Sequence, residues 1–135
     1  MRLFADASGW IALFNPRDKY HASAQRGIVR AVKHGDTLVT SDYVLDEVMT
    51  NLQRAVNHGV AAGAVQWILQ QPRIRLVFID EESWDKAWRL FQRYDDKEFS
   101  FTDCTSFAIM HQFKLRDAFT FDHHFTQMGF RLWPR

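Results

Sequence analysis

The chain has 135 residues, of which 47% are hydrophobic and 15% aromatic, which excludes intrinsically disordered, collagen-like and low-complexity proteins and predicts a single domain over residues 1–135. Seventeen Lys and Arg residues against sixteen Asp and Glu residues leave a net charge of +1, so no strong overall field draws the protein onto nucleic acid and any polyanion must bind locally. The one cysteine, Cys104, excludes an internal disulfide and favours a reducing compartment.

Short apolar runs alternate with longer amphipathic segments along the chain, which is typical of strands joined by crossover helices. In chain order, the predicted strands are Arg2–Ala5, Thr37–Thr40, Arg75–Ile79, Ala118–Phe121 and Phe130–Trp133. The predicted helices are Ser8–Phe14, Tyr20–Lys33, Asp42–Asn57, Val60–Gln71, Glu81–Tyr94 and Asp103–Phe113. This order predicts an α/β fold with a parallel sheet, in which functional groups gather at the carboxyl ends of the strands.

The predicted helix over residues 81–94 carries a strong apolar stripe. The stripe recurs at helical spacing and consists of Trp84, Ala87, Trp88, Phe91 and Tyr94. Such spacing is typical of a helix face that packs into the core, so we expect these side chains to be buried.

The amino-terminal segment shows no targeting signal, because it has a single basic residue and Asp6 interrupts its apolar stretch. Apolar runs such as Trp10–Phe14 are far shorter than the roughly 18 residues that span a bilayer. We therefore expect a soluble, cytoplasmic protein.

Acidic residues stand at the ends of two predicted strands. Asp6 directly follows the first strand, and Asp122 directly follows the fourth. A carboxylate at the rim of a sheet is partly desolvated and is stabilised by a positive partner. Each aspartate would serve equally well as an N-cap for the helix that follows, and the residues alone leave both interpretations open.

Two further acids lie on predicted helices. Thr102 is a candidate N-cap, which places Asp103 in the first turn of its helix, where the helix dipole favours an acid. Glu47 lies nearly opposite the apolar face of the helix over residues 42–57. This position suits a solvated side chain and equally a side chain that lines an open cleft.

Four carboxylates in one pocket would have a definite chemistry. They repel one another, and hard divalent cations such as Mg²⁺ or Mn²⁺, which take oxygen ligands, relieve that repulsion. Cations held in this way activate water and stabilise displacement at a phosphodiester. If the four acids converge, the sequence therefore predicts a hydrolase.

Four segments resemble, in order, the motifs of the PIN-domain ribonucleases, in particular the VapC-like toxins of type II toxin–antitoxin systems. These segments spread over nearly the whole chain and read FADASGWIALFNPRDKYH, SDYVLDEVMT, FSFTDCTSFAIM and AFTFDHHF. The resemblance implies a three-layer α/β fold with a central, mostly parallel sheet flanked by helices. It also implies an Mg²⁺- or Mn²⁺-dependent endoribonuclease that hydrolyses RNA with a metal-activated water and leaves a 5′-phosphate and a 3′-hydroxyl.

The resemblance also assigns site residues. The family's acidic positions, which are catalytic and hold one or two metal ions, are matched by Asp6, Glu47, Asp103 and Asp122. Its small polar position is matched by Ser8, where a hydroxyl supports an acid or a water, although a plain N-cap is an equally simple role.

The partners implied by the resemblance are an RNA substrate, a cognate antitoxin whose carboxyl-terminal segment lies across the acidic cleft, and a second copy of the toxin in a homodimer. Basic residues near the motifs either hold the RNA backbone or are ordinary solvated charges; they are Arg17, Lys19, Lys97 and Arg116.

His123 and His124 follow Asp122, where some family members carry a further acid. Imidazole suits Mn²⁺ and Zn²⁺ better than Mg²⁺, but no other His or Cys stands at a ligand spacing, so a structural or phosphate-facing role is equally open. The main alternative function is a non-catalytic PIN-like module that binds RNA or protein. A phosphoacceptor domain would need a lysine after the late strand, and a haloacid-dehalogenase-like phosphatase would need an acid where this chain has Ser8.

Overall fold

The computed structural model describes residues 1–134, within which the chain forms five strands and seven helices. The strands are β1 (Arg2–Ala5), β2 (Thr37–Ser41), β3 (Ile74–Val77), β4 (Asp117–Phe119) and β5 (Arg131–Trp133). The helices are α1 (Ala7–Phe14), α2 (His21–His34), α3 (Asp42–Ala55), α4 (His58–Gln70), α5 (Glu81–Arg93), α6 (Phe101–Gln112) and α7 (His124–Gln127). None of the described helices is both long and apolar enough to cross a membrane.

The strands form one parallel sheet in the order β3-β2-β1-β4-β5. In the central strand, Leu3 pairs with Leu38 of β2 on one side and with Asp117 of β4 on the other. The chain therefore winds outward from β1 in one direction and later returns to the other side of β1 as β4. In parallel α/β sheets, ligands bind outside the carboxyl ends of the strands at such a switch point.

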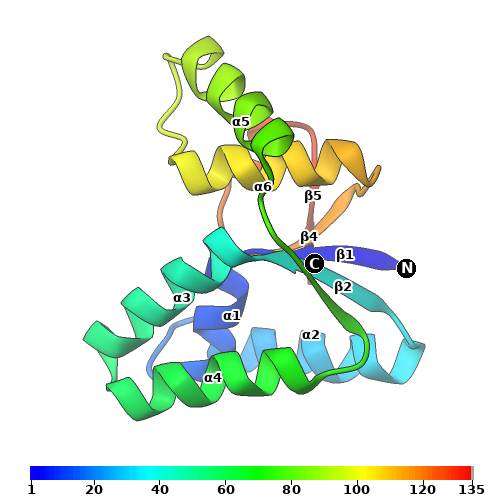
Figure 1. The fold of residues 1–135 in the computed structure, drawn as a ribbon. Helices are drawn as coiled ribbons and strands as arrows, with labels where there is room; N and C mark the ends of the chain where they lie inside the picture. The colour runs from blue at the N-terminus through cyan, green and yellow to red at the C-terminus, as the bar shows by residue number, and fades with distance from the viewer. Residues whose placement is uncertain (135) are drawn as a thin grey trace.

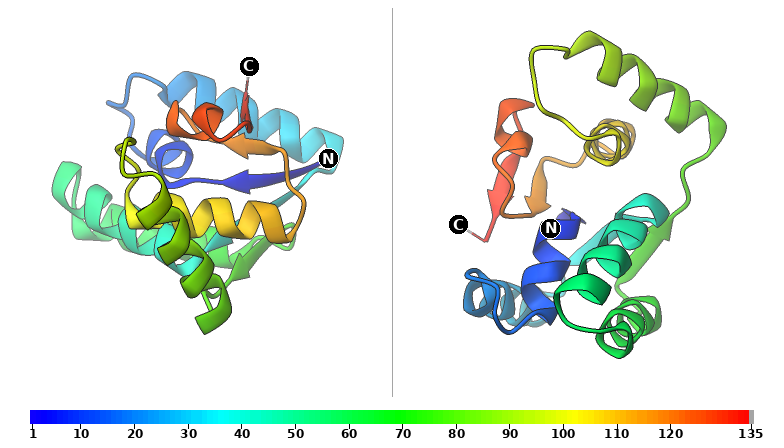
Figure 2. Two further views of the ribbon diagram at one scale, coloured as in Figure 1. Left: turned by 90° about the horizontal axis from the view of Figure 1, so that it is seen from above. Right: turned by 90° about the vertical axis from the view of Figure 1, so that its left-hand side faces the viewer.

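Helices cover both faces of the sheet (Figure 1). Helix α6 lies on one face, with α5 packed on its outer side, and α1, α2 and α4 lie on the other face. The right view of Figure 2 shows that α5 lies beyond α6, remote from the sheet. Aromatic side chains fill the core: Phe4, Phe107, Phe119 and Phe125 are fully buried, and Trp10 meets Phe119 edge-on with ring centroids 5.6 Å apart.

Helix α1 packs close against β4 because residue 9 is glycine. A Cβ atom on Gly9 would lie 2.5 Å from the carbonyl oxygen of Phe119, closer than a side-chain carbon tolerates. At the same junction, the Asp6 amide donates to that carbonyl oxygen at 3.1 Å. Gly9 therefore sets the distance between the end of β4 and the first turn of α1, which carries Ser8.

The predicted α/β order is confirmed, with element bounds within two residues. Two differences bear on the site. Strand β4 ends at Phe119 and not at Phe121, so Asp122 does not directly follow the strand; the Thr120 side chain bonds to Asp6 at 2.9 Å where the strand was expected to continue. The short helix α7 was not predicted, because a single turn carries no apolar period.

The prediction that the stripe on α5 is buried is wrong for Trp84, Trp88 and Phe91, whereas Tyr94 is partly buried against the core. The exposed fractions are 41% for Trp84, 44% for Trp88 and 43% for Phe91. Helix α5 buries its small Ala87 instead, and small residues let two helices approach closely. The exposed rings stack on one another, and those of Trp84 and Phe91 also contact Phe101 with centroids 5.2 and 6.3 Å apart.

Candidate active site

Asp6 lies where the carboxyl ends of β1 and β4 meet. It follows β1 directly, caps α1 and is 3% exposed. Its carboxylate oxygens have different surroundings. Oδ2 accepts hydrogen bonds from the hydroxyls of Thr120 at 2.9 Å and Ser8 at 3.1 Å. Oδ1 is buried, and no donor within residues 1–134 contacts it, so one oxygen is held in place and the other is available to a ligand.

The hydroxyls of Ser8 and Thr120 form a network that joins α1 to the chain after β4. Their oxygens lie 2.9 Å apart. The Phe121 amide donates to Ser8 Oγ at 2.9 Å, and the Asp122 amide donates to Thr120 Oγ1 at 3.0 Å. The same two hydroxyls therefore fix the carboxylate of Asp6 and the path of the backbone that carries Asp122.

A capping box holds Asp103 in the first turn of α6, as the sequence predicted, but the N-cap is not Thr102. The helix begins at Phe101, and Ser100 is the cap. The Ser100 hydroxyl accepts from the Asp103 amide at 3.0 Å, and Asp103 Oδ2 accepts from the Ser100 amide at 3.0 Å. Asp103 is buried and its backbone and side chain are both fixed.

The two histidines occupy different places. The amide of His124 donates to Asp122 Oδ1 at 2.9 Å, and its ring Nδ1 lies 3.2 Å from the same oxygen and 3.3 Å from Asp103 Oδ2. The ring of His124 therefore bridges two carboxylates, and it packs edge-on against Phe99 with centroids 5.5 Å apart. The side chain of His123 is 76% exposed at the rim of the site.

Glu47 stands on α3 at the solvent-exposed rim. The Ser41 hydroxyl caps this helix by accepting from the Val44 amide at 3.1 Å, and the apolar face of the helix, including Val48, is buried. Glu47 lies away from that face, as the periodicity predicts. It is nevertheless close enough to the other acids to interact with them electrostatically.

Burial and mutual repulsion raise the pKa of three of the acids. The pKa of Asp6 rises from 3.8 to about 6, first through burial and then through repulsion by Asp103. Partial burial of the Glu47 carboxyl and repulsion by the other three acids raise its pKa to about 7, an effect that solvent screens because Glu47 is exposed. Burial also raises the pKa of Asp103, against the hydrogen bond from Ser100. The four predicted acids thus share one electrostatic environment.

These side chains fit a hard divalent cation. Asp6, Glu47, Asp103 and Asp122 offer carboxylate oxygens, which Mg²⁺ and Mn²⁺ prefer, and a cation there would relieve their repulsion. The buried, unpartnered Oδ1 of Asp6 is the most direct sign of a missing positive partner. Asp122 and the two histidines also offer ligand atoms within 4.8 Å of one another.

Of the four basic residues named from the sequence, Lys19 lines a cavity that Asp122 also lines. Lys97 forms an ion pair at 3.2 Å with its neighbour in the chain, Asp96. Arg116 immediately precedes β4 and so lies at the opposite edge of the parallel sheet. Arg17 is exposed in the loop before α2.

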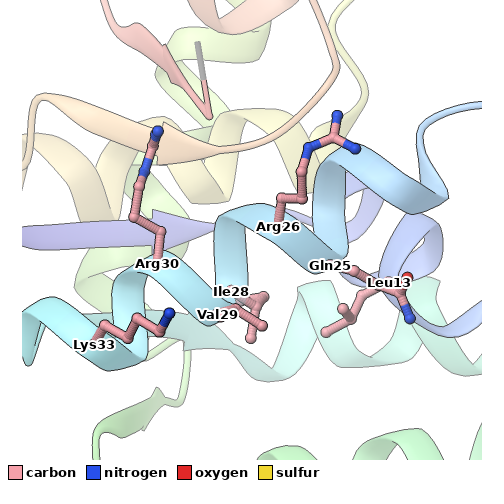
Figure 3. A pocket seen from close by; sticks show the side chains of 7 residues that line it. All are labelled: Leu13, Gln25, Arg26, Ile28, Val29, Arg30 and Lys33. Atoms are coloured by element: carbon pink, nitrogen blue, oxygen red, sulfur yellow. The ribbon is translucent and has the colours of Figure 1, made fainter.

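A larger cavity, of about 670 Å³, lies on α2 (Figure 3). Arg26, Arg30 and Lys33 project from the helix around the apolar side chains of Ile28 and Val29. None of the four acids lines this cavity. Its basic and apolar lining suits a binding surface and does not suit hydrolysis by acids and metal.

A family model described as the PIN domain matches residues 3–131. The chain belongs to the PIN-domain family. This PIN domain is 35% identical over 128 residues, 95% of each chain, to the protein named 23S rRNA-specific endonuclease VapC20 in two strains of Mycobacterium tuberculosis. The resemblance to VapC-like members is confirmed.

Two solved structures are similar to this PIN domain. The crystal structure of Mycobacterium tuberculosis VapC20, described as a Sarcin-Ricin loop cleaving toxin, matches with a TM-score of 0.88 and 33% identity over 95% of both chains. VapBC2 from Rickettsia felis, solved with a DNA fragment from its promoter, matches with a TM-score of 0.71 over 98% of this chain and 97% of that chain. At 11% identity the second match shows a common fold alone. The predicted three-layer α/β fold is confirmed.

Sequence reasoning missed Thr120 and Ser100, which orient Asp6 and Asp103. The sequence gives only a weak indication of Thr120, which is a single hydroxyl residue between two phenylalanines shortly before Asp122. Ser100 stands three residues before Asp103, which is the spacing of a capping box with Asp in place of Glu.

Proposed function

We propose that this PIN domain is a metal-dependent endoribonuclease that acts as the toxin of a toxin–antitoxin pair in the cytoplasm. The observation that supports this most strongly is the placement of four acids from four separate segments around the switch point of the sheet. One of their oxygens, Asp6 Oδ1, is buried without a donor among the described residues. Buried polar atoms in proteins usually have a hydrogen-bond partner.

In this proposal, Asp6, Glu47, Asp103 and Asp122 hold one or two Mg²⁺ or Mn²⁺ ions. The bound metal supplies the positive charge that activates water and stabilises the leaving oxygen of a phosphodiester. Ser8 and Thr120 hold one oxygen of Asp6 by hydrogen bonds and leave the second oxygen, which has no donor among the described residues, for the cation. His124 fixes the separation of two further acids by contacting both carboxylates.

The substrate we propose is ribosomal RNA, because the relative that is 35% identical over 95% of this chain is named a 23S rRNA-specific endonuclease. The cut site in the RNA would be a loop or another unpaired region, since a small concave acidic site reaches a phosphodiester more easily there than inside a duplex.

The test is cleavage of total RNA from a bacterium in the presence of Mg²⁺ or of a chelator. We expect discrete cleavage with Mg²⁺ that the chelator abolishes. Asp103→Asn should reduce cleavage by about 100-fold or more, because it removes a ligand charge worth several kcal/mol to the transition state. Asp95→Asn, at an exposed acid outside the site, is the matched control. Equal cleavage by the wild type and Asp103→Asn would refute this site assignment.

An antitoxin is the second partner that we propose. The cavity on α2 combines an apolar floor with three cations, so it suits an amphipathic antitoxin segment with acidic residues (Figure 3). A following basic residue of the antitoxin would then reach the acidic cleft. Co-purification with a small protein encoded beside the toxin would support this, and Arg26→Glu together with Arg30→Glu should weaken the complex.

We also propose a homodimer, in which the exposed stripe on α5 forms the contact between the two copies. Large exposed apolar patches on soluble proteins mark interaction sites. Acids lie at the start of this segment and bases at its end: they are Asp80, Glu81, Glu82 and Asp85, then Lys86, Arg89 and Arg93. This order suits the dipole of α5, and it also makes the helix complementary to an antiparallel copy of itself. The acids disfavour RNA on the same surface.

A further inference from the structure

A second cavity, of about 450 Å³, adjoins the acidic site. Ser8 and Asp122 line it and also belong to the site, so a group bound in this cavity lies directly beside the acids. Its volume is within the range of roughly 300–1,000 Å³ that is usual for small-molecule sites. Apart from His123, no role in binding the metal accounts for the rest of its lining.

Two parallel aromatic rings form one wall. The rings of Tyr20 and Phe121 are stacked with centroids 4.5 Å apart and an angle of 2° between their planes. Tyr20 is 38% exposed, whereas Phe121 is half-buried and backs it. Flat exposed rings next to a backbone-binding site are the usual platform for an unpaired base, because every base has a face that stacks.

Polar side chains around these rings suit the rest of a nucleotide. Lys19 is exposed, and its Nζ lies over the Tyr20 ring, 4.9 Å from the ring centre, in a place from which a stacked base would displace it. Asn51 of α3 lines the same cavity and carries an amide that both donates and accepts hydrogen bonds. The aromatic ring can stack on a base, the cation can pair with a phosphate, and the amide can form hydrogen bonds with the edge of the base.

The segment that carries Tyr20 is ordered before any ligand binds. Asp18 Oδ1 accepts from the Tyr20 amide at 2.8 Å, and Asn15 Oδ1 accepts from the Arg17 amide at 3.0 Å. His21 Nδ1 lies 2.8 Å from the carbonyl oxygen of Ala12 and ties the segment to α1. One oxygen of Asp18 is therefore bonded to the backbone, and these contacts hold the segment that carries the ring.

We propose that this cavity binds the nucleotide next to the cleaved phosphodiester, with its base stacked on Tyr20, a phosphate near Lys19 and a base edge at Asn51. The inference rests on the proposed ribonuclease function and adds to it a subsite for an unpaired nucleotide.

The experiment measures binding and cleavage separately. Binding of a fluorescent single-stranded RNA oligonucleotide is followed by anisotropy in chelator, where no cleavage is expected, and cleavage of the same RNA is followed in Mg²⁺. Tyr20→Ala should weaken binding about tenfold, since base stacking on an aromatic ring is lost. It should raise KM by a similar factor and change kcat little. Tyr20→Phe keeps the ring and should behave as the wild type.

Phe78→Ala is the matched control, because Phe78, which follows β3, is 69% exposed and lies outside the cavity. Thermal unfolding confirms that each variant is folded. The subsite is refuted if Tyr20→Ala binds RNA like the wild type, if Phe78→Ala weakens binding equally, or if Tyr20→Phe fails to restore binding. The subsite is also refuted if Tyr20→Ala weakens the binding of an antitoxin and leaves the binding of RNA unchanged. A wild type that binds RNA through Tyr20 but does not cut it would refute the nuclease and keep the subsite.

Discussion

At the scale of a single residue, the two carboxylate oxygens of Asp6 have different surroundings. Hydroxyls of Ser8 and Thr120 hold one oxygen, while the other is buried with no donor among residues 1–134. Burial of such a group is unfavourable without a positive partner, which is why the pKa of Asp6 rises to about 6. The acid is stabilised either by a proton or by a cation.

This competition gives a prediction for the metal-free protein. Because the pKa of Asp6 is raised from 3.8 to about 6, the folded state binds a proton more tightly than the unfolded chain. The contribution of Asp6 to the free energy of unfolding should therefore fall as the pH rises from about 4 to about 7 and then level off. A shift of two units corresponds to about 3 kcal/mol at most. Denaturant unfolding in chelator at pH 5 and pH 8 measures the fall.

Asp6→Asn keeps the shape and removes the charge, so it should flatten this pH dependence and raise the free energy of unfolding at pH 8 by about 1–3 kcal/mol. Mn²⁺ should stabilise the wild type at pH 8 and leave Asp6→Asn nearly unchanged. If the free energy of unfolding of Asp6→Asn depends on pH as steeply as that of the wild type, Asp6 is not the acid whose raised pKa causes the dependence.

The sequence could predict the four acids and, through the resemblance, the supporting hydroxyl of Ser8, but not the hydroxyls of Thr120 and Ser100. An aspartate after an apolar strand is visible as a pattern. The contact between Thr120 and Asp6 joins residues 114 positions apart, and it exists because β4 pairs with β1. Long-range contacts of this kind follow from the strand order, which local periodicity does not contain.

At the scale of elements, the distance between α1 and β4 controls the site. Gly9 allows α1 to approach β4 so closely that an added Cβ would meet the backbone oxygen of Phe119 at 2.5 Å. Backbone does not move aside as the tip of a side chain does. The first turn of α1, with Ser8, depends on this approach.

Gly9→Ala should therefore displace α1, lower the free energy of unfolding by about 1–3 kcal/mol and reduce cleavage of RNA. Gly63→Ala is the control, since Gly63 lies in α4 and an added Cβ there meets nothing within 4 Å. Alanine at that position should stabilise the helix by up to about 1 kcal/mol. Denaturant unfolding of both variants tests the pair, and a Gly9→Ala variant as stable and active as the wild type would contradict the account.

Helix α5 shows where element-level prediction fails. Its apolar stripe is real and its helix is where the periodicity places it, but Trp84 and Trp88 are exposed. Periodicity shows that a face is apolar and does not show whether the same chain or a partner covers it. Ala87 faces the core instead, because a small residue lets α5 pack closely on α6.

At the scale of the whole molecule, the net charge of +1 conceals local charge separation. Four acids meet at one edge of the sheet, while Arg26, Arg30 and Lys33 surround the cavity on α2. Acidic and basic residues are also separated along α5, where the acids come first and the bases follow. The near balance of acids and bases thus conceals distinct acidic and basic surfaces.

The proposal that the exposed stripe on α5 forms a homodimer can be tested by measuring the mass of the protein in solution. We expect a dimer in light scattering at micromolar concentration and a monomer for Trp88→Glu. Val32→Glu, at a 68% exposed residue of α2, should leave the dimer intact. Charge reversal is the sharper test: Glu81→Arg with Asp85→Arg, and separately Arg89→Glu with Arg93→Glu, should each weaken the dimer, and mixing the two variants should restore it. A monomeric wild type, or a dimer that Trp88→Glu leaves unchanged, would contradict the assignment.

Metal binding tests the central claim most directly, because it needs no knowledge of the RNA. Titration calorimetry with Mn²⁺ should show binding to the wild type at millimolar concentration or below, and Asp6→Asn or Asp103→Asn should weaken that binding at least about tenfold. Asp95→Asn should bind as the wild type does. If the wild type shows no Mn²⁺ binding at millimolar concentration, or if all variants bind alike, the four acids are not a metal site and the chain is a non-catalytic PIN-domain module.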